Sequence, residues 1–281
     1  MRIVSLLLTL ALLVLPALNA RAAESEKFAI YYADSLSPDH FRAYHLVVLD
    51  STRHVPLPPL KEEGKTLLGY LALGEVSQTN PAYATLKSHN LVLQENPNWK
   101  GSYFVDLRDP VWAKMVLEEI IPGILRQGFY GLFIDTLDSS IALEKSDPGK
   151  YAGMTEAAVH LIAAIRMNYP TVKIMMNRAY GILPKVASSL DMELGESVYS
   201  SYSADKKTYH KVEDVAYRDQ VAALQEAQHT NSNLKVYTLD YADPSDRIDV
   251  KDIYRIERAN GFIPYVATAG LDRLVDEPSS E

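Results

Sequence analysis

Eight short apolar runs recur along the chain, and each is bounded by turn residues and followed by a stretch of helical character. Runs that are apolar on both faces are typical of strands buried on both sides of a sheet, as in parallel α/β folds. In chain order, the predicted strands are Phe28–Ala33, His45–Asp50, Thr66–Glu75, Gly131–Leu137, Val172–Asn177, Leu190–Ser197, Leu234–Asp240 and Phe262–Ala267. Eight strand-then-helix units predict an α/β fold with one domain, a closed (β/α)8 TIM barrel.

Four of the connecting segments have apolar residues at three- and four-residue spacing, which is the pattern of an amphipathic helix. They are Val111–Gln127, Met154–Asn168, Glu213–Gln228 and Ile248–Ala259. The loop after the third strand, Val76–Pro110, is too long for a simple connection, and Tyr103–Leu107 within it is a candidate additional strand. Long loops inside a compact domain are often functional. The chain ends soon after the eighth strand, so only a short last helix is expected.

The first 22 residues have the pattern of a secretory signal peptide. Arg2 supplies a positive charge, Val4–Leu18 is almost entirely apolar, and Ala20–Ala22 offers a small-x-small cleavage pattern. The apolar stretch is shorter than the ~20 residues that span a bilayer, so we expect cleavage rather than stable membrane insertion. The sequence therefore predicts an exported protein, periplasmic or extracellular, whose barrel domain comprises residues 23–281.

Composition and missing motifs exclude several classes of function. The chain has no cysteine, which excludes disulfides and a thiol nucleophile, and its formal net charge of −8 argues against nucleic acid as a partner. Its seven histidines lack metal-ligand spacing. Neither a phosphate-binding glycine-rich loop nor a nucleophile elbow occurs. We therefore expect neither a metal ion nor a cofactor.

Acidic or amide side chains stand at the C-terminal ends of six predicted strands, namely Asp50, Glu75, Asp135, Asn177, Glu196 and Asp240. In a (β/α)8 barrel these ends meet on the face that carries active sites. Crowded carboxylates raise one another's pKa, and glycosidic cleavage requires one carboxylic acid and one carboxylate. Any one of these residues could instead cap the following helix. The six together favour the active site of a glycoside hydrolase.

Strand alternation indicates which acids face the inside of the barrel. Asp135 shares a face with Phe133, and Glu196 shares a face with Leu194, whereas Glu193 lies on the opposite face. If the apolar residues fill the barrel, Glu196 emerges at its mouth and Glu193 points towards the helices. Glu196 is therefore preferred over Glu193.

Tyrosines are abundant, with 18 residues, and aromatic faces and hydroxyls both suit sugar rings. Those beside the predicted mouth are Tyr31, Tyr180, Tyr199, Tyr202 and Tyr241. This abundance supports a carbohydrate substrate only weakly, because tyrosine is also common in half-buried positions.

Six segments in succession resemble motifs of one enzyme family. They are Tyr70–Glu75, Gly131–Asp138, Asn177–Gly181, Gly195–Val198, Leu239–Tyr241 and Gly261–Tyr265. The family is the endo-α-1,4-polygalactosaminidase-like glycoside hydrolases, which include the hydrolase domain of the Pel polysaccharide protein PelA. The resemblance runs from about Phe28 to Leu274, and the loop Val76–Lys100 departs from it. It implies a barrel that cleaves an exopolysaccharide rich in galactosamine or N-acetylgalactosamine within the chain.

The same resemblance places the catalytic residues of the family at Asp135 and Glu196, in agreement with the strand-face argument. We expect a retaining mechanism with Asp135 as nucleophile and Glu196 as general acid and then base, although the two roles could be exchanged. The residues expected to bind substrate are Asp50, Tyr70, Glu75, Asp138, Asn177, Asp240, Tyr241 and Tyr31. For Asp138, capping of the next helix is the alternative role. Two rival functions remain, a non-catalytic polysaccharide-binding barrel and a barrel hydrolase or lyase that acts on another amino-sugar polymer.

Overall fold

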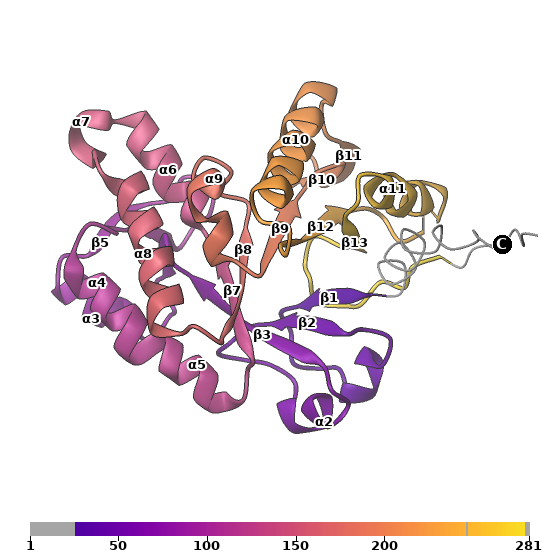
Figure 1. The fold of residues 1–281 in the computed structure, drawn as a ribbon, viewed down its shortest axis with the longest axis horizontal. Helices are drawn as coiled ribbons and strands as arrows, with labels where there is room; N and C mark the ends of the chain where they lie inside the picture. The colour runs from indigo at the N-terminus through magenta and orange to yellow at the C-terminus, as the bar shows by residue number, and fades with distance from the viewer. Residues whose placement is uncertain (1–25, 246, 279–281) are drawn as a thin grey trace, which may run out of the picture.

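The structure is a computed structural model that describes residues 26–245 and 247–278 (Figure 1). The predicted signal peptide, residues 1–22, lies outside the described residues. Eight parallel strands follow one another in chain order around one curved sheet. They are β1 (Phe28–Tyr31), β2 (Leu46–Leu49), β3 (Thr66–Ala72), β7 (Gly131–Asp135), β8 (Lys173–Asn177), β9 (Met192–Glu196), β12 (Lys235–Tyr241) and β13 (Ile263–Ala267). All eight predicted strands are present, and the sheet forms a nearly closed barrel, which confirms the fold class.

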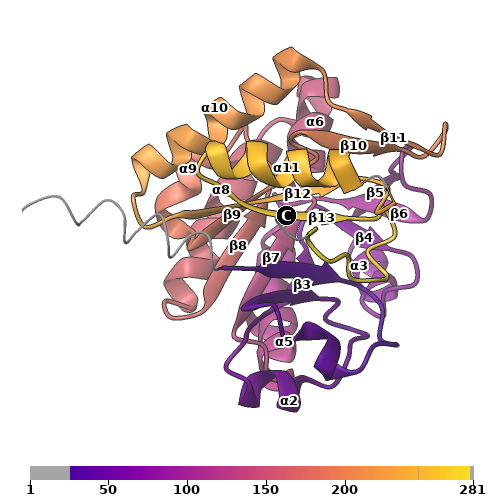
Figure 2. The same cartoon turned by 90° about the vertical axis from the view of Figure 1, so that its right-hand side faces the viewer.

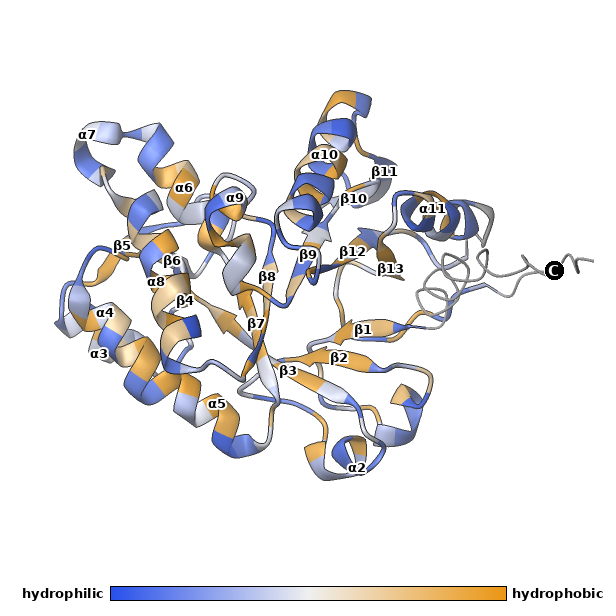
Figure 3. Ribbon diagram, viewed as in Figure 1, coloured by the Kyte–Doolittle hydropathy of each residue, from blue (hydrophilic) through white to orange (hydrophobic). Residues whose placement is uncertain are grey.

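The barrel strands are largely hydrophobic (Figure 3) because their two faces pack against different partners. Inside the barrel, the ring of Phe28 lies 4.9 Å from that of Tyr237 and 5.6 Å from that of Tyr265. On the outer face of β12, Val236 packs with Leu224 of the helix α10 (Asp214–Thr230). Odd-numbered residues of β12 therefore face the interior and even-numbered residues face the helices.

Helices cover the outside of the barrel, and the four predicted helices are all present. The α-helices are α2 (Leu57–Glu62), α3 (Tyr83–Ser88), α4 (Pro110–Met115), α5 (Ile121–Gln127), α6 (Leu137–Ser146), α7 (Pro148–Tyr151), α8 (Met154–Asn168), α9 (Leu183–Val186), α10 and α11 (Arg247–Ala259), with 3-10 turns at Pro38–Phe41 and Ala187–Ser189. The predicted helix Val111–Gln127 is interrupted by a π-helical turn at Val116–Ile120. Pro122 follows this turn and lacks the N–H that a continuous α-helix would use. Within the described residues, no helix is both long and apolar enough to cross a membrane.

Two small antiparallel sheets are added to the barrel, and Figure 2 places both on the same side of it. The first contains β4 (Glu75–Ser77), β5 (Val92–Glu95) and β6 (Ser102–Val105), in the order β4–β6–β5. The second is the hairpin of β10 (Ser200–Ser203) and β11 (Thr208–Lys211). The predicted additional strand corresponds to β6. The predicted strand Thr66–Glu75 is too long, because β3 ends at Ala72 and Glu75 begins β4.

The segment that follows β13 closes the seam between β1 and β13. Tyr32 N donates to Leu271 O at 2.8 Å, and Val275 N donates to the hydroxyl of Tyr265 at 3.3 Å. Farther along, both oxygens of Glu277 accept hydrogen bonds from Arg258 of α11, at 2.5 and 2.9 Å. Residues 268–278 contain no helix, so the short last helix that the sequence suggested is absent from the described part of the chain.

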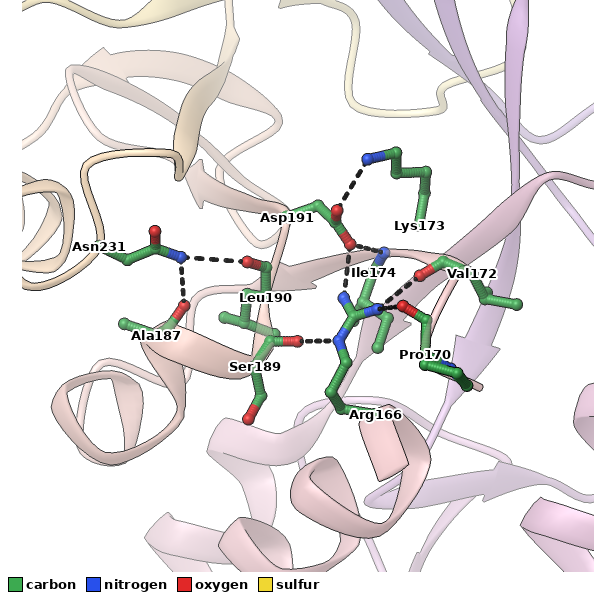
Figure 4. Close-up of polar contacts among 10 residues, drawn as sticks. All are labelled: Arg166, Pro170, Val172, Lys173, Ile174, Ala187, Ser189, Leu190, Asp191 and Asn231. Carbon is green, nitrogen blue, oxygen red and sulfur yellow. Dashed lines mark hydrogen bonds and ion pairs between the residues drawn. The ribbon is translucent and has the colours of Figure 1, made fainter. Parts of the chain in front are cut away.

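At the opposite end of the barrel, Arg166 of α8 connects the starts of β8 and β9 (Figure 4). Its guanidinium donates to Asp191 Oδ2 at 2.5 Å and to the carbonyl of Ser189 at 2.9 Å. The same Asp191 oxygen accepts from Ile174 N at 3.0 Å, and Lys173 Nζ lies 2.8 Å from Asp191 Oδ1. Because this face of a (β/α)8 barrel serves stability rather than chemistry, the network helps to fix the strands whose other ends carry the site.

Candidate active site

Asp135 and Glu196 lie together at the C-terminal ends of β7 and β9, with Asn177 of β8 between them. Asn177 Nδ2 donates to Asp135 Oδ1 at 3.0 Å and to Glu196 Oε2 at 2.7 Å. Because one nitrogen atom bonds both oxygens, they lie no farther apart than the sum of these two distances, about 5.7 Å. Both residues are partly exposed.

A tyrosine hydroxyl holds the other oxygen of each carboxylate. Tyr70 of β3 donates to Asp135 Oδ2 at 2.8 Å, and Tyr241 of β12 donates to Glu196 Oε1 at 2.6 Å. Five successive strands of the barrel, β3, β7, β8, β9 and β12, thus contribute one residue each to a continuous chain of hydrogen bonds. The structure brings these five predicted residues together at one point of the mouth.

Burial and neighbouring charges change the pKa values of the hydrogen-bonded residues at the mouth. Burial and, second, the negative charge of Glu196 raise the pKa of Asp135 to about 6, although hydrogen bonds from Tyr70 and Asn177 oppose the shift. Burial and then the nearby carboxylates raise the pKa of Tyr70 and Tyr241 well above the usual value. Both hydroxyls therefore stay protonated and act as donors. Asp135 is ionised near neutral pH and becomes protonated in mild acid.

Tyr32, which follows β1, also lies at the mouth, although it was not predicted as a site residue. Its ring meets that of Tyr70 edge to face, with 5.3 Å between centroids. Burial, followed by the charges of Asp135, Glu196 and Asp50, raises its pKa well above the usual value. Tyr32 therefore lies close enough to Asp135 and Glu196 for their charges to affect its hydroxyl.

Tyr31 occupies a different environment from the one predicted. Its side chain is fully buried, and its hydroxyl bonds Ser35 Oγ at 3.0 Å and accepts from Leu36 N at 3.2 Å. Since Phe28 points into the barrel, alternation places Tyr32 on the inner side and Tyr31 on the outer side. The direction of Phe28 is seen in the structure and not in the sequence, so the sequence did not distinguish Tyr32 from Tyr31.

Asp50 and Glu75 both organise loops beside the mouth. Asp50 Oδ1 accepts hydrogen bonds from the amide and hydroxyl of Thr52, at 2.6 and 2.7 Å. Glu75 is buried, and its oxygens accept from Asn96 Nδ2 at 2.9 Å, Ser139 Oγ at 2.5 Å and Ser102 Oγ at 2.6 Å. Glu75 thereby joins the small sheet β4–β6–β5 to the first turn of α6.

Asp138 lies in the first turn of α6, whose N-cap position is Thr136. Asp138 Oδ2 lies 3.6 Å from the guanidinium of Arg178, and each side chain is close to half exposed. Burial raises the pKa of Asp138, and the charge of Arg178 opposes this shift. The pair places a positive charge beside the acids of the mouth. Arg178 was not predicted as a site residue, because its role depends on a contact between the residue after β8 and the helix α6.

Asp240 and Glu193 both face the helices rather than the barrel interior. Asp240 is fully buried, and its Oδ1 accepts from the amides of Tyr199 at 2.7 Å and Ser200 at 2.8 Å. It therefore does not join the group at the mouth. Glu193 was predicted to point towards the helices; it is fully buried, and burial raises its pKa well above the usual range.

The chain turns sharply after each of the three central residues. The next residue has a left-handed backbone at Thr136 (φ 67°), Arg178 (φ 57°) and Ser197 (φ 56°). Such conformations cost about 1–3 kcal/mol in residues other than glycine and concentrate at functional sites. At the first turn, Gly74 is required, because a Cβ on it would lie 2.1 Å from Thr136 O.

This geometry suits acid–base and nucleophilic chemistry on a glycosidic bond, since two carboxylates in different environments stand close together. No group of three or more His, Asp or Glu side chains among the described residues is arranged to hold a metal ion.

Comparisons with known proteins agree with this chemistry. A sequence model of glycoside-hydrolase family GH114 matches residues 15–280. An uncharacterized protein of Deinococcus radiodurans is 27% identical over 273 residues, which cover 92% of this chain and 84% of that protein.

Two solved structures share the fold. The glycoside hydrolase domain of PelA from Pseudomonas aeruginosa aligns with a TM-score of 0.78 at 24% identity, over 89% of this chain and 98% of that one. Aspergillus fumigatus Ega3, solved in complex with galactosamine, aligns with a TM-score of 0.66 at 15% identity, over 90% of this chain and 94% of that one. These similarities support the barrel architecture described above.

Proposed function

The chain belongs to glycoside hydrolase family GH114, and from that premise we propose that it cleaves a polysaccharide rich in α-1,4-linked galactosamine or N-acetylgalactosamine, at bonds within the polymer. The observation that carries the proposal is the pair Asp135 and Glu196, joined through one amide nitrogen at the barrel mouth. The galactosamine bound to the similarly folded Ega3 supports an amino-sugar substrate. Acidic side chains around the mouth suit the ammonium group of such a sugar.

The proposed mechanism is retaining. Retaining enzymes have carboxyl groups about 5–5.5 Å apart, and inverting enzymes about 6.5–9.5 Å apart. The upper limit of about 5.7 Å between the two bridged oxygens of Asp135 and Glu196 favours retention. Asp135 attacks the anomeric carbon as the bond to the leaving oxygen breaks, and Glu196 gives its proton to that oxygen. Glu196 then takes a proton from water, the water oxygen bonds the anomeric carbon, and Asp135 leaves.

Asp135 is proposed as the nucleophile, and a pKa of about 6 leaves it ionised near neutral pH, as that role requires. Tyr70 and Tyr241 orient the two carboxylates, and Asn177 connects them. The remaining substrate contacts are assigned to partly exposed groups at the mouth, namely Asp50, Asp138 and Tyr32. Export through residues 1–22 is part of the proposal, because a polysaccharide of this kind lies outside the cell.

The test is to incubate the purified protein with α-1,4-linked galactosamine polymer and to measure new reducing ends and product sizes. We expect a series of oligosaccharides from the wild type. Asp135→Asn and Glu196→Gln should each abolish their release while the melting temperature changes little. Binding without new reducing ends would instead support the non-catalytic barrel. Cleavage confined to a different amino-sugar polymer would support the other rival.

A further inference from the structure

Two consecutive residues of β12 contact the segment that carries Glu196 from opposite faces of the strand. Tyr241 faces the interior and donates to the Glu196 carboxylate at 2.6 Å. Asp240 faces the helices and accepts the amides of Tyr199 and Ser200, at 2.7 and 2.8 Å. One strand thus holds both the side chain of Glu196 and the backbone that follows it.

The backbone after Glu196 needs such support because it is strained. Ser197 has a left-handed conformation with φ of 56°, which is strained in a residue other than glycine. Ser197 N donates to Leu239 O at 2.8 Å, and Ser197 O accepts from Gln220 of α10 at 3.2 Å. The two bonds to Asp240 fix Tyr199 and Ser200, which lead from this turn into the hairpin β10–β11.

Asp240 has no other evident reason to be a carboxylate in this position. It is fully buried, and Glu257 of α11, also fully buried, lies close enough that its charge interacts with Asp240. Burying two acids together is unfavourable, and burial raises the pKa of Asp240 to about 7 although the bonded amides oppose the shift. An apolar residue would avoid this cost but would leave two loop amides without an acceptor.

We infer that Asp240 is a positioning residue, which holds the turn after Glu196 and thereby sets the place of the Glu196 carboxylate opposite Asp135. This inference deepens the proposed function and rests on it. Catalytic groups must be held within about 0.5 Å of the productive geometry, and a displacement of about 1 Å can cost a hundredfold in rate.

Asp240→Ala and Asp240→Asn distinguish positioning from a merely structural role. Oδ1 alone accepts both amides, so the amide oxygen of asparagine can replace it, whereas alanine offers no acceptor. Asp240→Ala should lower kcat by about tenfold to a hundredfold with little change in KM, and Asp240→Asn should retain most of the kcat. If Asp240→Ala does not fold, Asp240→Val, which also offers no acceptor, takes its place. Equal loss in the asparagine variant, or wild-type kcat in the alanine or valine variant, would overturn the inference.

The matched control is Glu257→Gln, which alters the same buried acidic pair without touching the loop amides and should leave kcat unchanged.

Hydrogen exchange at the amides of Tyr199 and Ser200 tests the two hydrogen bonds to Asp240 without any turnover. We expect it to be several-fold faster in Asp240→Ala than in Asp240→Asn, because alanine leaves both amides without their acceptor. Unchanged exchange would refute the positioning role of Asp240 even if the wild type cleaves the polymer. Faster exchange in a protein that does not cleave it would refute only the proposed function.

Discussion

Each carboxylate of the proposed active site is held by one tyrosine and by the shared amide of Asn177. The tyrosines act as permanent donors because burial and the adjacent carboxylates raise the pKa of Tyr70 and Tyr241. Permanent donors stabilise the ionised form of a carboxylate. The hydrogen bond from Tyr70 therefore opposes the effect of burial on Asp135, and the balance between the two sets the pH range of the enzyme.

Protonation of Asp135 should limit activity in acid. With a pKa of about 6 for Asp135, kcat/KM should fall about tenfold for each pH unit below about 6. Tyr70→Phe removes a donor that lowers this pKa, so the fall of kcat/KM in acid (the acid limb of the pH profile) should move to higher pH. Tyr241→Phe is the control, since its hydroxyl bonds Glu196 instead. An equal shift in both variants, measured from the pH dependence of kcat/KM, would mean that the limb does not report Asp135.

The residues that were misplaced from the sequence are those whose role depends on which face of the strand their side chain occupies. Asp135, Asn177 and Glu196 could be placed because several acids at strand ends share one face of a barrel. Tyr31 and Asp240 could not, because strands apolar on both sides give no sign of which face is the interior. Asp240 and Tyr241 are adjacent in sequence, yet one caps a loop and the other binds Glu196.

At the scale of elements, the barrel strands were predictable and the additions at the mouth were less so. A parallel strand buried on both sides must be an apolar run, and all eight strands occur where such runs stand. The hairpin β10–β11 was missed because its polar sequence lacks the alternation of a half-buried strand. Asp138 does not cap α6, because Thr136 occupies the N-cap position, but it does lie in the first turn of that helix.

The loop after β3 lies so close to the turn after β7 that residue 74 should tolerate no side chain. In Gly74→Ala the new Cβ would lie 2.1 Å from Thr136 O and 2.9 Å from Ser140 Oγ. Because a backbone atom cannot move aside cheaply, we expect a loss of about 3 kcal/mol or more in the free energy of unfolding. Thr136 follows Asp135, so kcat should fall as well.

The matched control for this change is Gly123→Ala, in the helix α5. A Cβ there meets only the flexible end of Arg126, at 3.9 Å. Alanine is also the better helix former by about 1 kcal/mol, so this variant should be as stable as the wild type or more so. Urea denaturation and kcat give both comparisons. Equal effects of the two substitutions would show that the β3 loop does not constrain the turn after Asp135.

At the scale of the whole molecule, the barrel lacks a last helix in the described residues and is closed by the segment 268–278 instead. Glu277 anchors that segment through two bonds to Arg258 and an ion pair with Lys27 at 3.5 Å. Burial alone would raise the pKa of Glu277, but its hydrogen bonds and ion pairs outweigh burial and lower it. The contribution of Glu277 to stability is therefore present above its unfolded pKa and is lost as pH falls through the lower folded value.

Glu277→Gln should lower the free energy of unfolding by about 1–3 kcal/mol at pH 7, and the difference should shrink towards pH 3. The exposed Asp39, which pairs with Arg42 while both side chains are about 70% exposed, is the control. Asp39→Asn should cost about 0.5 kcal/mol or less. Urea denaturation at both pH values measures these changes. A pH-independent loss in Glu277→Gln would rule out the ion pairs as the anchor of the seam.

The most direct test of the whole account is to trap the sugar on the enzyme. In Glu196→Ala, a galactosaminide with a good leaving group needs no acid to react with Asp135. Water then attacks the covalent glycosyl-enzyme only slowly, because the base is missing. Intact mass spectrometry should therefore detect a covalent adduct of one sugar residue, and peptide mapping should place it on Asp135. An adduct on another residue, or turnover with inverted configuration and no adduct, would contradict the account.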